Sequence, residues 1–283
     1  EAPPETDLAD RDSLLAGLEH AYGDSGVPRG GWVDLERIVA EVWSPDVDPQ
    51  DSRQYYLNQV THASDSWLSA PEWGRCVRVE SLRDRDVVCL GFDGSVRDDS
   101  TALVACRLAD GHLELLGCWE PRRAALDDPD PQVDRESVDA AVVAAFDRFQ
   151  VVGFYADPPF WQGYVDAWTA KFGAGLRVRQ VQARPIEWWT NRPTAMVAAL
   201  ERFHSAVLNE ELSHDGDSVL SAHVLNARRR IGRAGVSIGK ENPKSARKID
   251  AAMAATLAFE CRCDALAQGV NAVEDAWVPV RVR

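Results

Sequence analysis

The chain has 283 residues, enough for one large domain or for a domain with a smaller attachment. Hydrophobic residues make up 45% and charged residues 27%, which excludes a disordered or fibrous protein, and no apolar run approaches the roughly 18 residues of a membrane helix. The formal net charge of -14 at pH 7 would argue against binding to nucleic acid if it were spread evenly.

The charge is distributed unevenly along the chain. Residues 1–75 carry 15 Asp and Glu against five Lys and Arg, whereas residues 227–248 carry eight Lys and Arg and one Glu. Such a local positive excess is typical of a phosphate-binding surface, and a solvated basic loop explains it equally well. The candidate DNA-binding residues in this region are Arg228, Arg229, Arg233, Lys240, Lys244, Arg247 and Lys248.

The start of the chain and its cysteines bear on where the protein works. The first residues are acidic and Pro-rich, unlike a secretory signal, and the six Cys are too scattered for a disulfide scaffold. We therefore expect a protein that is not secreted and keeps its thiols reduced. Because the first residue is not Met, we also expect a piece of a longer protein.

Helices and turns are predicted for the front of the chain, with a domain boundary near residue 75. The spacing of apolar residues predicts one helix that starts at Asp12 and a second over residues 35–42. A third, short helix is predicted over residues 53–59 between Pro-rich breaks.

Strands are predicted from residue 86 onward. The continuous apolar run at 87–92 predicts a central strand, and Asp110-Gly111 predicts a tight turn between two later strands. The predicted order is strands at 87–92, 101–108 and 112–119, a helix near 138–149, a strand at 151–156, a helix at 162–172, a strand at 176–181, and helices at 194–208 and 249–266. This order predicts an α/β mixed sheet flanked by helices, with ribonuclease H-like topology.

Three aspartates stand at the ends of predicted elements. Asp93 closes the first buried strand, where Gly91 leaves room for another group, Asp157 ends the second, and Asp250 lies in the first turn of the last helix. Carboxylates brought together raise one another's pKa unless a cation neutralises them, and oxygen ligands suit Mg²⁺ or Mn²⁺. Together they predict a divalent metal site, although each alone has an ordinary explanation as a turn or helix-start residue.

Other chemistry-bearing residues give weaker signals. Asp99 lies in a predicted hairpin loop, where turn formation explains it better than metal binding, and an accessory metal role stays open. His214 and His223 lie near acidic residues, and a position on a loop surface explains them better than a ligand role. The sequence has no phosphate-loop, dinucleotide, zinc-protease or serine-hydrolase motif.

Three segments together resemble a known family, the large terminase subunit of tailed bacteriophages, in its C-terminal nuclease domain. They are Leu90-Gly-Phe-Asp-Gly-Ser95 with Asp99-Ser-Thr-Ala-Leu103, Phe154-Tyr-Ala-Asp-Pro-Pro159, and Lys244-Ser-Ala-Arg-Lys-Ile-Asp-Ala-Ala-Met-Ala-Ala255. The likeness covers most of residues 80–265. Residues 53–59 look like the segment that joins the packaging ATPase to the nuclease, and residues 1–50 look like the end of the ATPase region.

The resemblance implies a function for the whole chain. Residues 76–283 would form a ribonuclease H-like endonuclease that cuts concatemeric double-stranded viral DNA during packaging, behind a helical remnant of the ATPase region at 1–75. Asp93, Asp157 and Asp250 would hold two divalent ions, Mg²⁺ or Mn²⁺, for two-metal phosphodiester hydrolysis.

Partners and location follow from the same resemblance. Besides double-stranded DNA, which residues 244–248 would lie beside, it implies the portal protein, the small terminase subunit and the ATPase domain of the same protein. The place of action would be the cytoplasm of the infected bacterium. Two alternatives stay open: another ribonuclease H-like nuclease of the resolvase or integrase type, and a non-catalytic DNA-binding or assembly module.

Overall fold

The computed structural model describes two compact units. Its described residues are 1–44, 52–53, 55–59, 65–95, 99–121, 132–180, 183–242 and 245–271. The units are Glu1–Ser64 and Asp65–Arg283. The boundary therefore lies earlier than the one predicted after residue 75, because Trp67, Leu68 and Trp73 are buried in the core of the large unit. Every helix among the described residues is too short or too polar to cross a membrane.

The small unit is built on two short helices. Each of α1 (Arg11–Tyr22) and α2 (Leu35–Val42) follows an Asp whose side chain accepts a hydrogen bond from the first backbone N–H groups of the helix. Between them lie two single turns, η1 (Gly23–Ser25) and η2 (Val27–Arg29). The apolar sides of the helices enclose a small core. Both helices were predicted; the predicted helix over 53–59 lies partly outside the described residues.

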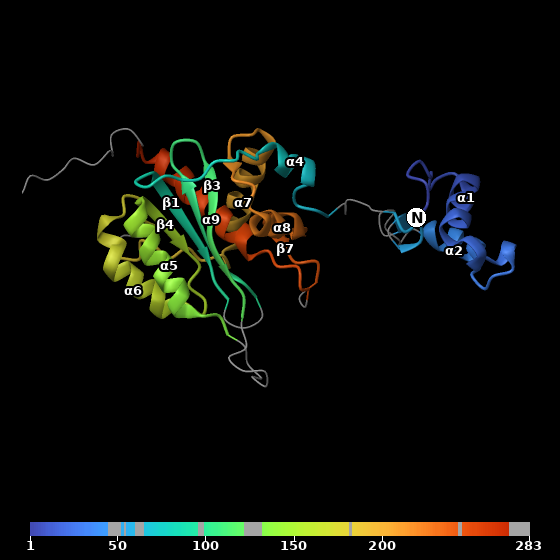
Figure 1. Cartoon of the computed structure of the whole chain (residues 1–283), viewed down its shortest axis with the longest axis horizontal. Coiled ribbons are helices and arrows are strands. Elements are labelled where there is room, and N and C mark those ends of the chain that lie inside the picture. Colours follow the sequence, from blue (N-terminus) through green and yellow to red (C-terminus); the bar gives the residue numbers. More distant parts are fainter. Residues whose placement is uncertain are drawn as a thin grey trace, which may run out of the picture. The chain divides into compact units, whose positions relative to one another are not determined.

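A mixed sheet of five strands, in the order β4-β1-β2-β3-β5, forms the centre of the large unit (Figure 1). Its strands are β1 (Val87–Asp93), β2 (Thr101–Arg107), β3 (His112–Trp119), β4 (Gln150–Ala156) and β5 (Ser213–His214). The first three are antiparallel neighbours, as the hairpin spacing predicts, and Gly111 has φ 76° at the predicted turn. β4 runs parallel to β1, so these two strands end at the same edge.

Helices cover both faces of this sheet (Figure 1). They are α4 (Ala70–Arg75), α5 (Arg135–Arg148), α6 (Gln162–Phe172) with the turn η3 (Gly173–Gly175), α7 (Pro193–Leu208), α8 (Ser218–Asn226) and α9 (Asp250–Ala267). Alternate residues of β1 point to opposite faces, so Val88, Leu90 and Phe92 share a core with α5 and α6. Cys89 belongs to the other core, which α7, α8 and α9 complete.

Small residues let α9 lie directly on the sheet. A side chain at Gly91 in β1 would overlap the backbone of Ala254 and Ala258, and one at Gly153 in β4 would overlap the Sγ atom of Cys261. The face of α9 that was predicted to pack on the sheet is indeed buried. Because of this close approach, α9 begins beside the ends of β1 and β4.

Two parts of the large unit differ from the sequence prediction. The predicted strand at 176–181 is wrong for its described residues 176–180, where Arg177 and Val178 both donate their backbone N–H groups to the carbonyl of Val152 at 2.8 and 3.0 Å. The fifth strand is β5, which pairs with β3 at the opposite edge. Neither α8 nor the hairpin of β6 (Arg228–Gly232) and β7 (Gly235–Gly239) was predicted.

Candidate active site

Asp93 and Asp157 lie next to each other at one edge of the sheet. Asp93 is the last residue of β1, and Asp157 directly follows β4. Phe92 and Ala156 are opposite each other in the parallel ladder, and the backbone N–H of Asp157 donates to the carbonyl of Phe92 at 3.1 Å. The sequence prediction that each of these aspartates ends a buried strand is confirmed, and the ladder shows that the two strands are neighbours.

Thr190 holds the carboxylate of Asp157. Its backbone N–H donates to Oδ1 at 3.1 Å and its hydroxyl donates to Oδ2 at 2.6 Å. Burial raises the pKa of Asp157, and the two bonds from Thr190 partly oppose this rise. Thr190 was not singled out from the sequence, because it lies 33 residues away from Asp157 and carries no motif.

Asp250 is the first residue of α9 and is buried, with 7% of its surface exposed. Its Oδ2 atom is buried and has no hydrogen-bond partner among the described residues. Burial, and after it the charge of Asp99, raises the pKa of Asp250 to about 6. The side chain therefore keeps one carboxylate oxygen free at a place where solvent cannot reach it.

The three predicted aspartates form one electrostatic cluster. Burial, followed by the charges of Asp250, Asp157 and Asp99, raises the pKa of Asp93 well above its usual range. In the described part of the chain no three Asp, Glu, His or Cys side chains are arranged to hold a metal ion as they stand. The carboxylates thus interact through their charges without converging on one point.

Asp99 joins this cluster with cations of its own. Its Oδ1 accepts hydrogen bonds from the ammonium groups of Lys240 and Lys248, the latter at 3.1 Å. Burial acts to raise the pKa of Asp99, but the two lysines outweigh it and the pKa is lowered. Asp99 is therefore an ionised carboxylate between the other acids and two of the predicted DNA-binding residues.

The chain was compared with protein families, with curated proteins and with solved structures. No family model matches the chain. The "Gene 13 protein" of Mycobacterium phage D29 and that of Mycobacterium phage L5 are each 37% identical to it over 269 residues. Each match covers 90% of this chain and 44% of the relative, so the chain spans less than half the length of these proteins.

The large terminase of bacteriophage HK97 has a similar crystal structure. The match has a TM-score of 0.54 at 22% identity and covers 93% of this chain and 56% of that one. The chain has the fold of a phage large terminase. The resemblance carried by the three sequence segments is thereby confirmed at the level of the fold, as is the ribonuclease H-like mixed sheet.

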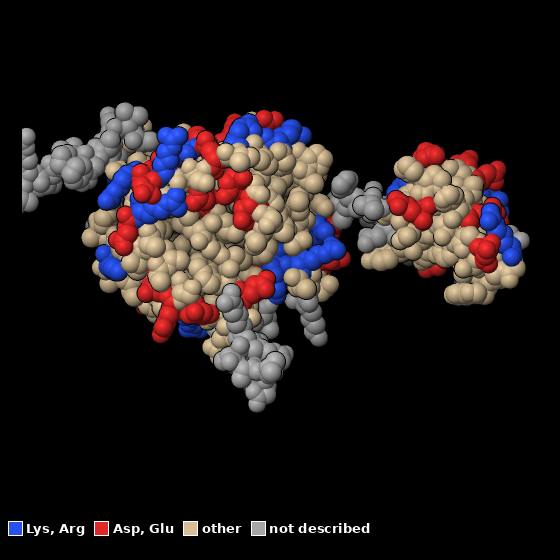
Figure 2. Space-filling view, viewed as in Figure 1, with Lys and Arg blue, Asp and Glu red and all other residues tan. Residues whose placement is uncertain are grey.

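The basic residues predicted to bind DNA lie in different surroundings. Figure 2 shows a group of Lys and Arg side chains where Figure 1 places β7. Arg229 and Arg233, on the hairpin of β6 and β7, are exposed, and exposed Arg247 pairs with Glu241 at 3.7 Å. Lys244 lies outside the described residues.

Arg228 has a structural contact instead. Only 11% of its side chain is exposed, and its guanidinium donates to Ser66 Oγ at 3.2 Å and to the carbonyl of Leu225 at 3.0 Å. It thus ties the start of the large unit to the end of α8. Its place in a DNA-binding surface is therefore weaker than that of Arg229 and Arg233, which point to solvent.

Both histidines that were expected on a loop surface are buried, so that expectation was wrong. His214 stacks on Trp73 with ring centroids 3.9 Å apart and contacts the Trp73 carbonyl through Nε2. His223 accepts a hydrogen bond through Nδ1 from the backbone N–H of Ala251 at 2.9 Å. Burial, with Lys248 second, lowers the pKa of His223 to about 4, so its ring is neutral near pH 7.

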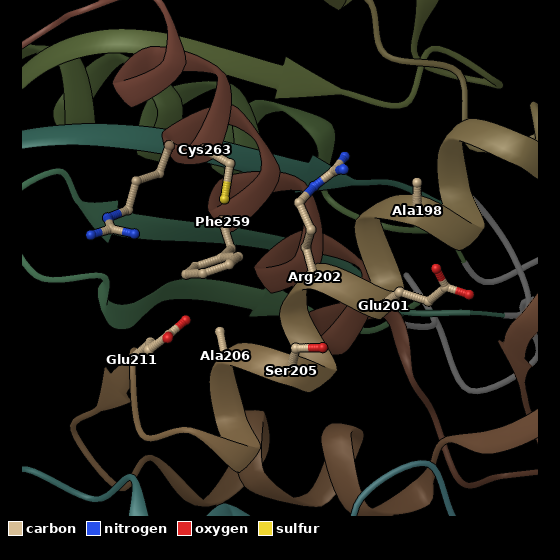
Figure 3. Close-up of a pocket in the computed structure, with 9 residues that line it drawn as sticks. Ala198, Glu201, Arg202, Ser205, Ala206, Glu211, Phe259 and Cys263 are labelled. Carbon is tan, nitrogen blue, oxygen red and sulfur yellow. The ribbon is translucent and has the colours of Figure 1, made fainter.

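Two of the pockets formed by the described residues border α7. One, of about 580 Å³, lies between α7 and α9, and its walls include Glu201 and Arg202 of α7 and Phe259 and Cys263 of α9 (Figure 3). It contains none of the clustered aspartates. The other, of about 440 Å³, lies between α7 and the hairpin, and its wall includes Thr190, which donates a hydrogen bond to Asp157.

Proposed function

We propose that the large unit is the nuclease domain of a phage large terminase and that it cleaves double-stranded viral DNA during packaging. The observation that carries this proposal is the cluster of Asp93, Asp157 and Asp250, which the ends of two strands and the start of one helix hold together despite their like charges. Charged groups kept close at such a cost are typical of functional sites. The fold of the HK97 large terminase supports the packaging role.

The donor chemistry of the cluster fits Mg²⁺ or Mn²⁺. Its groups are carboxylates, the ligands that these hard cations prefer, and the buried Oδ2 of Asp250 has no partner among the described residues. Asp93, Asp157 and Asp250 would hold two such ions. When bound, divalent metal supplies an activated water and offsets the charge that develops on the phosphate.

The other residues of the site would orient a metal ligand or bind the DNA backbone. Thr190 fixes the orientation of the Asp157 carboxylate through two hydrogen bonds. Lys240 and Lys248 stand beside the acidic cluster, where they would exchange Asp99 for a DNA phosphate. Arg229 and Arg233 on the exposed hairpin would contact the sugar-phosphate backbone without reading bases, so we expect little sequence specificity.

The rest of the assembly is inferred from the same resemblance. The small unit would be the end of the packaging ATPase region, and the ATPase itself, the small terminase subunit and the portal protein would be partners. The chain has no phosphate-loop motif, so this piece would not drive translocation. Its place of action would be the cytoplasm of the infected bacterium.

Cleavage of supercoiled plasmid tests the proposal. The chain is incubated with Mn²⁺, Mg²⁺ or EDTA beside Asp93→Ala and Asp250→Ala, with Asp166→Ala, exposed on α6, as the matched control. We expect metal-dependent cutting by the wild type and the control and none by the two cluster variants, all shown to be folded by circular dichroism. Equal cutting by the cluster variants would place the active site elsewhere.

Calorimetric titration with Mn²⁺ covers the case in which no cutting is seen. If the wild type binds Mn²⁺ and Asp250→Ala does not, the site is correct and the chain needs its missing partners to cut. If the wild type binds no Mn²⁺ and cuts nothing, the nuclease proposal is wrong and the non-catalytic module is the better description.

A further inference from the structure

The start of α9 needs a hydrogen-bond acceptor from elsewhere in the fold. The first backbone N–H groups of a helix have no partner within it, and the residue before α9, Ile249, has no side chain that caps them. His223 of α8 supplies one, because its Nδ1 accepts the backbone N–H of Ala251 at 2.9 Å from 28 residues away in the sequence. The cap is buried, since 5% of His223 is exposed and Ala251 is fully covered.

This bond fixes which nitrogen of His223 carries the proton. A nitrogen that accepts a hydrogen bond must be unprotonated, so the neutral ring carries its hydrogen on Nε2. Leu220 and Val224 of the same helix are buried apolar side chains, as His223 is buried. An apolar residue would fill the same space, but it would leave the N–H of Ala251 buried without an acceptor.

The capped peptide is the one that follows Asp250. Asp250 and Ala251 are the first two residues of α9, so a bond that fixes the N–H of Ala251 also fixes the backbone from which the Asp250 carboxylate projects. That carboxylate has one buried oxygen with no partner among the described residues. A carboxylate oxygen can bind a metal ion well only if the backbone that carries it is held in a fixed position.

We propose that His223 is a positioning residue of the active site: by accepting the N–H of Ala251 it holds the first turn of α9 so that Asp250 presents its free oxygen to a divalent cation. This inference rests on the proposed function, because it assigns His223 a role toward the same metal. His223 acts through Asp250, in the way that partners of metal ligands orient those ligands.

Mn²⁺ titration of the whole chain by calorimetry tests this role. His223→Ala removes the acceptor and should weaken Mn²⁺ binding about tenfold. His223→Asn should restore binding to near the wild-type value, because the Asn Oδ1 occupies the place of Nδ1 and accepts the same bond. Val224→Ala is the matched control, since it loosens the packing of α8 without touching the cap; it should lower the melting temperature and leave Mn²⁺ affinity unchanged.

A spectroscopic readout tests the hydrogen bond without metal. The ¹⁵N shifts of the His223 ring should report an unprotonated Nδ1 and a protonated Nε2 in the metal-free wild type. A proton on Nδ1 would overturn the inference, as would Mn²⁺ affinity in His223→Ala equal to the wild type, or in Val224→Ala as weak as in His223→Ala. Wild-type chain that binds no Mn²⁺ would overturn the proposed function and this inference together, whatever the ring shifts show.

Discussion

Gly91 and Ala258 meet backbone to backbone, with the missing side chain of Gly91 making room for the Ala258 nitrogen. Gly91→Ala should therefore push α9 away from β1, lowering the free energy of unfolding by about 3 kcal/mol through overpacking. Because α9 carries Asp250, Mn²⁺ affinity should fall as well. Urea unfolding and Mn²⁺ titration measure the two effects.

Gly163→Ala is the control for this change. Gly163 lies in α6, and a methyl group there would contact nothing. Because Ala favours a helix over Gly by about 1 kcal/mol, this variant should be as stable as the wild type or more so. A Gly91→Ala protein of unchanged stability would show that the contact between β1 and α9 yields more easily than its geometry indicates.

The acidic cluster should make metal-free stability depend on pH through Asp250. Its pKa is raised to about 6 in the folded chain, above its ordinary value, because burial and the charge of Asp99 disfavour the ionised form. A raised pKa contributes stability that is complete below the unfolded value and is lost as pH rises through the folded one. Between about pH 4 and pH 7 in EDTA, the wild type should therefore lose about 1 to 3 kcal/mol relative to Asp250→Asn.

Divalent metal should reverse this loss. At pH 7, added Mn²⁺ should raise the melting temperature of the wild type and leave that of Asp250→Asn nearly unchanged, because a cation that binds only the folded cluster stabilises it. Urea unfolding at several pH values gives the difference between the two proteins. A difference that stays constant from pH 4 to pH 7 would contradict the raised pKa.

Thr190 offers a test of how the Asp157 carboxylate is held. Thr190→Val keeps the shape and the backbone bond to Oδ1 but removes the hydroxyl bond to Oδ2. The pKa of Asp157 should rise further, because a bond that favours its charged form is lost, and Mn²⁺ affinity should fall several-fold. Thr190→Ser retains the hydroxyl and should behave like the wild type; carboxyl ¹³C titration and calorimetry measure both quantities, and equal values for Val and Ser would refute the role.

Substitution of two arginines of the hairpin, Arg228 and Arg233, should affect DNA binding differently. Arg233 is exposed, so Arg233→Ala should weaken DNA binding and lower the slope of log affinity against log salt by about 1. Arg228 is tied to Ser66 and Leu225, so Arg228→Ala should lower the melting temperature with little change in that slope. The reverse pattern, measured by fluorescence anisotropy on duplex DNA, would assign DNA contact to Arg228 instead.

The sequence was sufficient for most of the fold because the main strands are continuous apolar runs. It failed at the hairpin of β6 and β7, whose residues are all partly or fully exposed and show no alternation of buried positions. It also failed at 176–180, where Leu176 and Val178 are buried and alternate like a strand, although their segment bonds β4 through one carbonyl. In this segment the alternation of apolar residues reflects burial of Leu176 and Val178, and not pairing with a neighbouring strand.

The candidate site divides in the same way. Asp93, Asp157 and Asp250 were predictable because each stands at the end of a strand or helix that the pattern of apolar residues predicts. Thr190 and His223 were not, because Thr190 contacts Asp157 from 33 positions away through two hydrogen bonds, and His223 contacts Ala251 from 28 positions away through one. A hydrogen bond between residues far apart in the sequence produces no repeating pattern from which it could be predicted.

The close packing of α9 on the sheet also shields a set of thiols. Cys89, Cys106 and Cys261 are fully covered between the strands and this helix, and burial raises the pKa of both Cys106 and Cys261 well above the usual range. Thiolates are the reactive form, so the thiols of Cys106 and Cys261 stay unreactive while α9 is packed on the sheet. We therefore expect alkylation of Cys261 to require a local opening in which α9 separates from β4. The alkylation rate would then measure how often that opening occurs.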